Sequence, residues 1–97
     1  MRWILSLRAK ADLRRIGYYI ARDNPRAAAI WVRKLQDRAR LAGRSPRQGR
    51  RVPELERDDI REAIVGTYRV VYIIRAKLVE VLTIFEGHKL LPDDLEL

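Results

Sequence analysis

The strongest constraint on the fold is a short segment, Tyr68–Ile74, that is apolar on both sides of an extended chain. Alternate side chains of a strand point to opposite faces of the sheet. The alternation places four apolar side chains on one face and two on the other: Tyr68, Val70, Tyr72 and Ile74, then Val71 and Ile73. Such a strand belongs in the middle of a sheet, with at least one face covered by helices.

Turn residues on both sides of this strand predict an antiparallel meander. Gly66-Thr67 is a two-residue Gly-X hairpin turn, and it follows a predicted strand at Ile60–Val65. A second turn at Ala76-Lys77 leads into the last predicted strand, Leu78–Phe85.

The N-terminal half predicts a short strand followed by a helical hairpin. Trp3–Leu5 is the strand, and Ser6 is placed to cap a helix. Helical spacing then predicts a buried apolar stripe formed by Ala9, Leu13, Ile16 and Ile20. Gly17 lies beside this stripe, and the basic residues lie off it: Arg14, Arg15 and Arg22.

A second helix is expected from Pro25 to Ala42, with Asn24 as its N-cap and Gly43 as its C-terminal cap. Its predicted buried face comprises Ala28, Trp31, Val32, Leu35, Ala39 and Ala42. Ile30 and Leu41 lie on another side of this helix. Together with Tyr18 of the first helix they are either ordinary exposed hydrophobes or an apolar patch on which a partner docks.

These elements predict an α+β fold: an N-terminal strand and a helical hairpin packed on a small antiparallel sheet. The 97 residues suffice for one domain, residues 1–97. The chain has no cysteine, which excludes disulfides and thiol chemistry, and no apolar run approaches membrane-spanning length. We therefore expect a cytoplasmic protein that does not bind membranes.

The formal net charge of +8 predicts an acidic partner, such as nucleic acid or an acidic protein, although solubility alone would also explain it. The segment Arg44–Arg51 holds four arginines and no acid. We expect it to be a loop, either a solvated connector or an edge that faces phosphates.

Candidate chemistry is sparse. Strand alternation puts Arg69 and Arg75 on the same face, where each either pairs with a glutamate of the next strand, such as Glu80 or Glu86, or serves function. His88 is the only histidine and, with Lys89, follows the last strand. We find no catalytic-triad or metal-ligand spacing and expect neither a metal nor a cofactor.

The sequence resembles the RelE/ParE superfamily of toxins from bacterial toxin–antitoxin pairs. The resemblance covers nearly the whole chain and rests on four ordered segments: Ala9–Ala28, Ser45–Leu55, Ile60–Tyr72 and Val81–Pro92. It implies a helical hairpin on a small antiparallel sheet. It also implies two different activities, because the RelE branch cleaves messenger RNA on the ribosome and the ParE branch poisons DNA gyrase without nuclease activity.

Most of the RelE-like nuclease pattern is missing. Its two strand lysines fall on Ile60 and Glu62, and its C-terminal tyrosine falls near Leu95. The catalytic residues that the resemblance would retain are Arg69, His88 and Lys89.

The resemblance therefore favours a ParE-like gyrase poison, and leaves open a RelE-like ribosome-dependent endoribonuclease or a member that only binds its antitoxin. The implied partners are a ParD-like antitoxin, in a hetero-oligomeric complex, and DNA gyrase, including gyrase that holds DNA. We expect six residues to bind partners: Tyr18, Ile30, Leu41, Arg61, Arg69 and Lys89.

Overall fold

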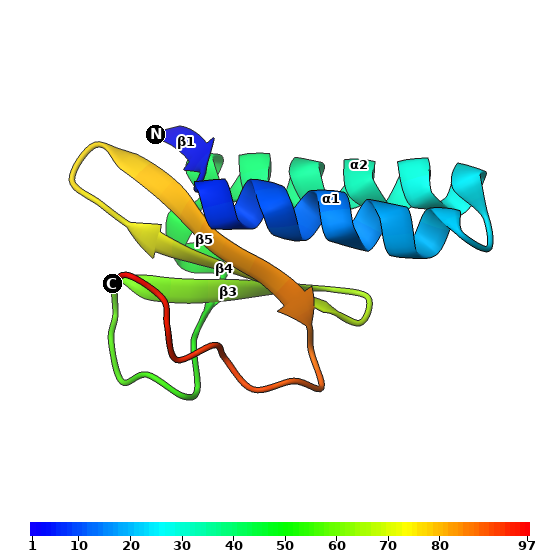
Figure 1. The fold of residues 1–97 in the computed structure, drawn as a ribbon. Helices are drawn as coiled ribbons and strands as arrows, with labels where there is room; N and C mark the ends of the chain where they lie inside the picture. The colour runs from blue at the N-terminus through cyan, green and yellow to red at the C-terminus, as the bar shows by residue number, and fades with distance from the viewer.

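A computed structural model describes residues 1–97 and confirms the α+β fold, with two helices packed on one sheet (Figure 1). The helices are α1 (Leu7–Ala21) and α2 (Pro25–Arg44), and a single 3-10 turn, η1, spans Pro46–Gln48. The strands are β1 (Arg2–Leu5), β2 (Arg50–Arg51), β3 (Ile60–Val65), β4 (Tyr68–Ile74) and β5 (Leu78–Glu86).

The sheet has the strand order β1-β5-β4-β3-β2, so β4 is the central strand, as the apolar pattern predicts. The neighbouring pairs among β2, β3, β4 and β5 are antiparallel, whereas β1 pairs with β5 in parallel. The sheet is therefore mixed and not purely antiparallel as expected. A parallel pair needs a long crossover connection, and the helical hairpin that follows β1 begins that connection.

The two helices cover one face of the sheet and enclose the main core (Figure 1). Gly17 lets them approach closely, since a Cβ at this position would lie 3.1 Å from a methyl group of Val32. Ser6 and Asn24 cap the two helices as predicted, each accepting a hydrogen bond from the backbone N–H three residues on.

Gly43 is not the C-terminal cap, because α2 continues through it to Arg44. The glycine is needed for a different reason. A Cβ there would lie 2.9 Å from the Met1 carbonyl oxygen and 3.1 Å from the Cβ of Trp3. A residue without a side chain is therefore required at this position, because β1 packs directly against the end of α2.

The arginine-rich segment Arg44–Arg51 is more ordered than a loop: after α2 it forms η1 and then β2, which pairs with β3. Tyr72, fully buried in β4, holds the segment in place. Its hydroxyl donates to the Pro46 carbonyl oxygen at 2.5 Å and accepts from the Gly49 N–H at 3.2 Å. Burial raises the pKa of Tyr72, so the hydroxyl keeps its proton for this bond.

A bulge in β5 breaks the alternation expected for that strand. Val71 of β4 pairs with Thr83, but its neighbour Tyr72 pairs with Val81, so Leu82 is an extra residue. Asp12 of α1, itself buried, binds the bulge: its Oδ2 accepts from the Thr83 hydroxyl at 2.6 Å and from the Ile84 N–H at 3.0 Å.

The second face of the sheet is covered by irregular chain and not by helices (Figure 1). A smaller core lies there, consisting of Val52, Ile60, Val71, Ile73 and Leu82. Leu55, from the segment between β2 and β3, and Leu91, from the chain after β5, pack against it. This second cover explains why β4 is apolar on both faces. No helix in the structure combines the length and the hydrophobicity needed to cross a membrane.

Candidate functional site

The centre of the second face is a buried guanidinium, that of Arg69, with only 5% of the residue exposed. Its Nε donates to Glu62 Oε1 at 2.7 Å. Its two terminal nitrogens donate to both carboxylate oxygens of Glu54, at 2.9 and 2.7 Å. Such a two-pronged arrangement is the strongest geometry for an arginine–carboxylate pair.

Further contacts complete this charge network. Glu62 is almost fully buried, and its second oxygen accepts from Arg50 Nε at 2.5 Å. The ring of Phe85 lies under the guanidinium, 4.9 Å from Arg69 Cζ to the ring centroid. The buried carboxylate of Glu62 and the partly exposed carboxylate of Glu54 thus face two arginines, which is how a charge can be tolerated away from water.

The network also holds the chain that follows β5. The Leu91 N–H donates to Glu54 Oε2 at 3.0 Å, and Arg69 donates to the Lys89 carbonyl oxygen at 3.4 Å. Hydrogen bonds from Arg69, with a smaller contribution from Leu91, lower the pKa of Glu54 from 4.5 to about 2. Hydrogen bonds with Glu54 and, second, with Glu62 raise the pKa of Arg69.

Arg69 is one of the residues expected to bind a partner, but the structure places it in contact with this chain's own carboxylates. It stands on the central strand and its donors are occupied by carboxylates of this chain. The glutamate that meets it across the strands is Glu62 of β3, and not one from β5. For Arg75 the pairing explanation is confirmed, because Arg75 donates to Glu80 Oε1 at 2.9 and 2.8 Å.

The other predicted cationic residues do not all share one site with Arg69. The Arg61 side chain is mostly buried and binds Asp58 Oδ1 at 2.7 Å and the Gly49 carbonyl oxygen at 3.1 Å. Arg47, with Arg61 as a lesser contributor, lowers the pKa of Asp58. His88 is exposed, 3.5 Å from Glu86, and with Arg69 it lines one surface pocket that Lys89 does not line. Lys89 itself is exposed.

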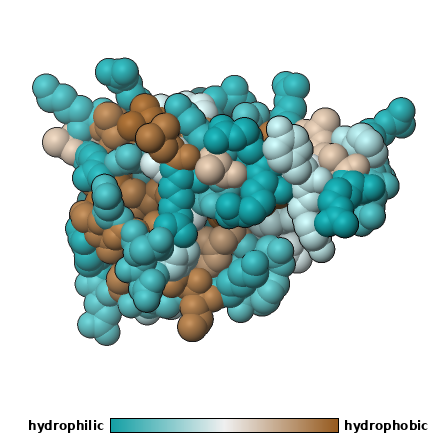
Figure 2. All heavy atoms as spheres, viewed as in Figure 1, coloured by the Kyte–Doolittle hydropathy of each residue, from teal (hydrophilic) through white to brown (hydrophobic).

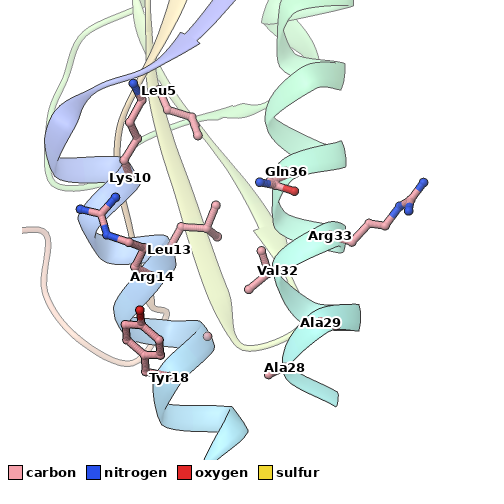
Figure 3. A pocket seen from close by; sticks show the side chains of 11 residues that line it. Leu5, Lys10, Leu13, Arg14, Tyr18, Ala28, Ala29, Val32, Arg33 and Gln36 are labelled. Carbon is pink, nitrogen blue, oxygen red and sulfur yellow. The ribbon is translucent and has the colours of Figure 1, made fainter. Parts of the chain in front are cut away.

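A groove runs between the two helices on their outer side (Figure 3). Leu13 and Val32 point toward each other in the close-up and form its apolar floor with Leu5, Ala28 and Ala29. Basic side chains border it, and no acidic residue lines it: Lys10, Arg14 and Arg33 are its charged residues. The groove is therefore suited to an amphipathic segment with negative charge.

The three predicted apolar contacts are all exposed but do not form one patch. Tyr18 is 73% exposed and lines the groove. Ile30 and Leu41 are 50% and 40% exposed and lie on α2 outside it.

Comparison with known families decides the identity. A family model described as the ParE toxin of the type II toxin–antitoxin system, parDE, matches residues 3–91. This chain belongs to the ParE toxin family. The predicted resemblance to the ParE branch is confirmed. The matched range includes both helices, every strand except the first residue of β1, and the Glu54–Arg69–Leu91 contacts.

A solved structure titled "Chromosomal ParDE TA system from P. aeruginosa" shares the fold. Its TM-score is 0.73 at 20% sequence identity, and the match covers 89% of this chain and 95% of that chain. A search of curated proteins gives no match.

Two acidic residues of this ParE toxin were missed as partners of Arg69. Glu62 was recognisable in principle, because alternation across the Gly66-Thr67 turn puts it one diagonal step from Arg69, on the same face. Glu54 carries no such signal, since it lies in irregular chain. No group of three or more acidic or histidine side chains is placed to hold a metal ion.

We predict very different costs for removing Arg69 of β4 and Arg75, the residue that directly follows β4. Arg69→Ala leaves the buried carboxylate of Glu62 without its main partner and should destabilise the toxin by about 3–5 kcal/mol. Arg75→Ala removes an exposed pair and should cost less than about 1 kcal/mol. Urea unfolding of both variants measures the difference, and equal costs would show that the Arg69 network contributes no more than a surface pair.

The lowered pKa of Glu54 predicts a specific loss of stability in acid. A carboxyl whose pKa is lowered by folding contributes stability that is present above its unfolded pKa and is lost as the pH falls through the folded value. For Glu54 this window runs from about 4.5 down to about 2. The wild type should therefore lose more stability than Glu54→Gln over that range, as measured by thermal melts at each pH. Parallel curves would contradict the assignment.

Proposed function

We propose that this ParE toxin poisons DNA gyrase by binding to it, and that a cognate ParD-like antitoxin neutralises the toxin in a hetero-oligomeric complex. Family membership supports both parts. The single observation that favours gyrase poisoning over ribonuclease activity is the occupation of Arg69 by two carboxylates of its own chain.

A ribonuclease that uses the 2′-hydroxyl as nucleophile needs positive charge beside the phosphorane, together with a proton acceptor and a proton donor. In the RelE-like pattern, Arg69 would supply that charge. Here Glu54 and Glu62 occupy its donors and neutralise its charge. His88 and Lys89 would remain, but only His88 lines the pocket that Arg69 reaches. This geometry favours the ParE-like function over the RelE-like alternative.

Charge supports a target that carries DNA. Nine of the 21 lysines and arginines form salt bridges within the chain, and the other twelve form none. The net charge of +8 remains for the surface. It would favour encounter with gyrase that holds DNA, and equally with an acidic antitoxin segment.

We predict that the antitoxin-free toxin abolishes supercoiling by purified gyrase and causes linear DNA to accumulate on the enzyme. The reaction contains relaxed plasmid and ATP, and a control contains toxin premixed with antitoxin. Unaffected gyrase together with ribosome-dependent cleavage of a message, lost in Lys89→Ala, would establish the nuclease alternative. No effect in either assay would leave a protein that only binds its antitoxin.

The groove between the helices is the proposed seat of the antitoxin. Its apolar floor and basic border match an amphipathic acidic segment that folds as it binds. Tyr18 lies at the groove, and a segment that continues over α2 would reach Ile30 and Leu41. Lys89 remains exposed for a partner, whereas Arg61 is engaged with Asp58 and Gly49.

We predict that the double change Lys10→Glu and Ala29→Asp weakens antitoxin binding about 10-fold or more, because it places two negative charges in the groove. The double change Ile30→Asp and Leu41→Asp tests separately whether the antitoxin contacts these two exposed side chains of α2 outside the groove. Isothermal titration with the antitoxin measures both, and the melting temperature of each free variant controls for folding. Unchanged affinity in the first double variant would show that the antitoxin does not bind in the groove. Unchanged affinity in the second would show that it does not contact Ile30 and Leu41.

A further inference from the structure

The exposed side of α1 presents arginines and tyrosines that the fold does not use. Six residues line a surface depression there, which we name the α1 face: Ala11, Arg14, Arg15, Tyr18, Tyr19 and Arg22. Tyr18 and Tyr19 are 73% and 65% exposed. Neither tyrosine has a hydrogen-bond partner for its hydroxyl or a cation stacked on its ring within the chain.

Two of the three arginines of this face have no carboxylate partner within the chain. Arg15 forms a salt bridge with Asp12, whose other carboxylate oxygen binds the neutral donors of Thr83 and Ile84 in β5, so Arg15 is the compensated cation of this face. Arg14 and Arg22 form no salt bridge. The space-filling view is mostly teal and white, not brown, over the far ends of the two helices (Figure 2).

The order of the residues along the helix is what identifies a ligand. Arg14 and Arg15 form one tier, Tyr18 and Tyr19 the next, and Arg22 the last. With a rise of 1.5 Å per residue, the two basic tiers lie about 10 Å apart, with the aromatic tier between them. Ala11 leaves room beside the first tier.

We propose that the α1 face binds single-stranded nucleic acid, with phosphates on the arginines and unpaired bases stacked on Tyr18 and Tyr19. Aromatic side chains set between cations that follow the backbone are the usual means of binding single strands. A duplex would use the arginines but would leave both rings without a partner, because its bases are already stacked. This binding activity goes beyond the proposed action on gyrase and does not require it.

The direct test is fluorescence anisotropy of the antitoxin-free toxin with a labelled oligothymidylate of roughly 12 nucleotides and with a duplex of the same length. We expect the single strand to bind at least about 10-fold more tightly than the duplex. Its affinity should fall roughly 10-fold between about 50 and 200 mM salt, as two or three phosphate contacts require.

Substitutions separate stacking from charge. Tyr18→Ala and Tyr19→Ala should each lower the affinity about 10-fold, whereas Tyr19→Phe, which keeps the ring, should leave it unchanged. Arg22→Ala should weaken binding and reduce the salt dependence. The matched control is Arg40→Ala, an exposed arginine of α2 that pairs with Asp37; it removes the same charge elsewhere and should have little effect.

Equal affinity for the duplex, or binding that survives both tyrosine-to-alanine changes, would overturn the proposal. Gyrase assays on the same variants keep it distinct from the proposed function. A toxin that fails to bind either oligonucleotide, yet loses gyrase poisoning in Tyr19→Ala and Arg22→Ala, would assign the α1 face to a protein partner and would also overturn it. A toxin that binds the single-stranded oligonucleotide but does not inhibit gyrase would support this inference and contradict only the proposed function.

Discussion

The second face of the sheet depends on one buried cation, the guanidinium of Arg69. Such a group is tolerated only when charged partners replace the water that it loses. Glu62 provides one carboxylate from the neighbouring strand, and Glu54 provides another from irregular chain. Because Glu54 also accepts from the Leu91 N–H, the two irregular segments that cover this face meet at the same ion pair. This ion pair thereby fixes the positions of the two irregular segments that cover the second face in place of helices.

This use of Arg69 moves the interaction surfaces elsewhere. Arg69, the arginine that a nuclease would need, is bound by Glu54 and Glu62, whereas most cations on the two helices form no salt bridge. The groove proposed for the antitoxin and the α1 face proposed for nucleic acid share Arg14 and Tyr18. If both proposals hold, the two ligands cannot occupy the toxin together. An acidic segment in the groove would then cover Arg14 and Tyr18 and so prevent nucleic acid from binding to the α1 face, even if it did not contact the other residues of that face.

Local patterns in the sequence were sufficient for the helices, their N-caps, the Gly66-Thr67 turn and the central place of β4, since each depends on residues close in the chain. Pairings between distant segments were not recoverable in this way. β1 pairs with β5 across more than 70 residues, and β2 has only two residues and no apolar alternation. Arg69 was ambiguous because strand alternation gives the face of a side chain but not which neighbouring strand, or which irregular segment, provides its partner.

The bulge in β5 shows how one such long-range contact determines another. Strict alternation from Val81 would send Phe85 to the helix-covered face and Ile84 to the second face. The extra residue reverses this, so Ile84 joins the main core and Phe85 lies under Arg69. Asp12 of α1 accepts a hydrogen bond from the Ile84 N–H next to the bulge. A carboxylate on the helical side of the sheet thus stabilises the register that places an aromatic ring beneath the buried cation on the other side.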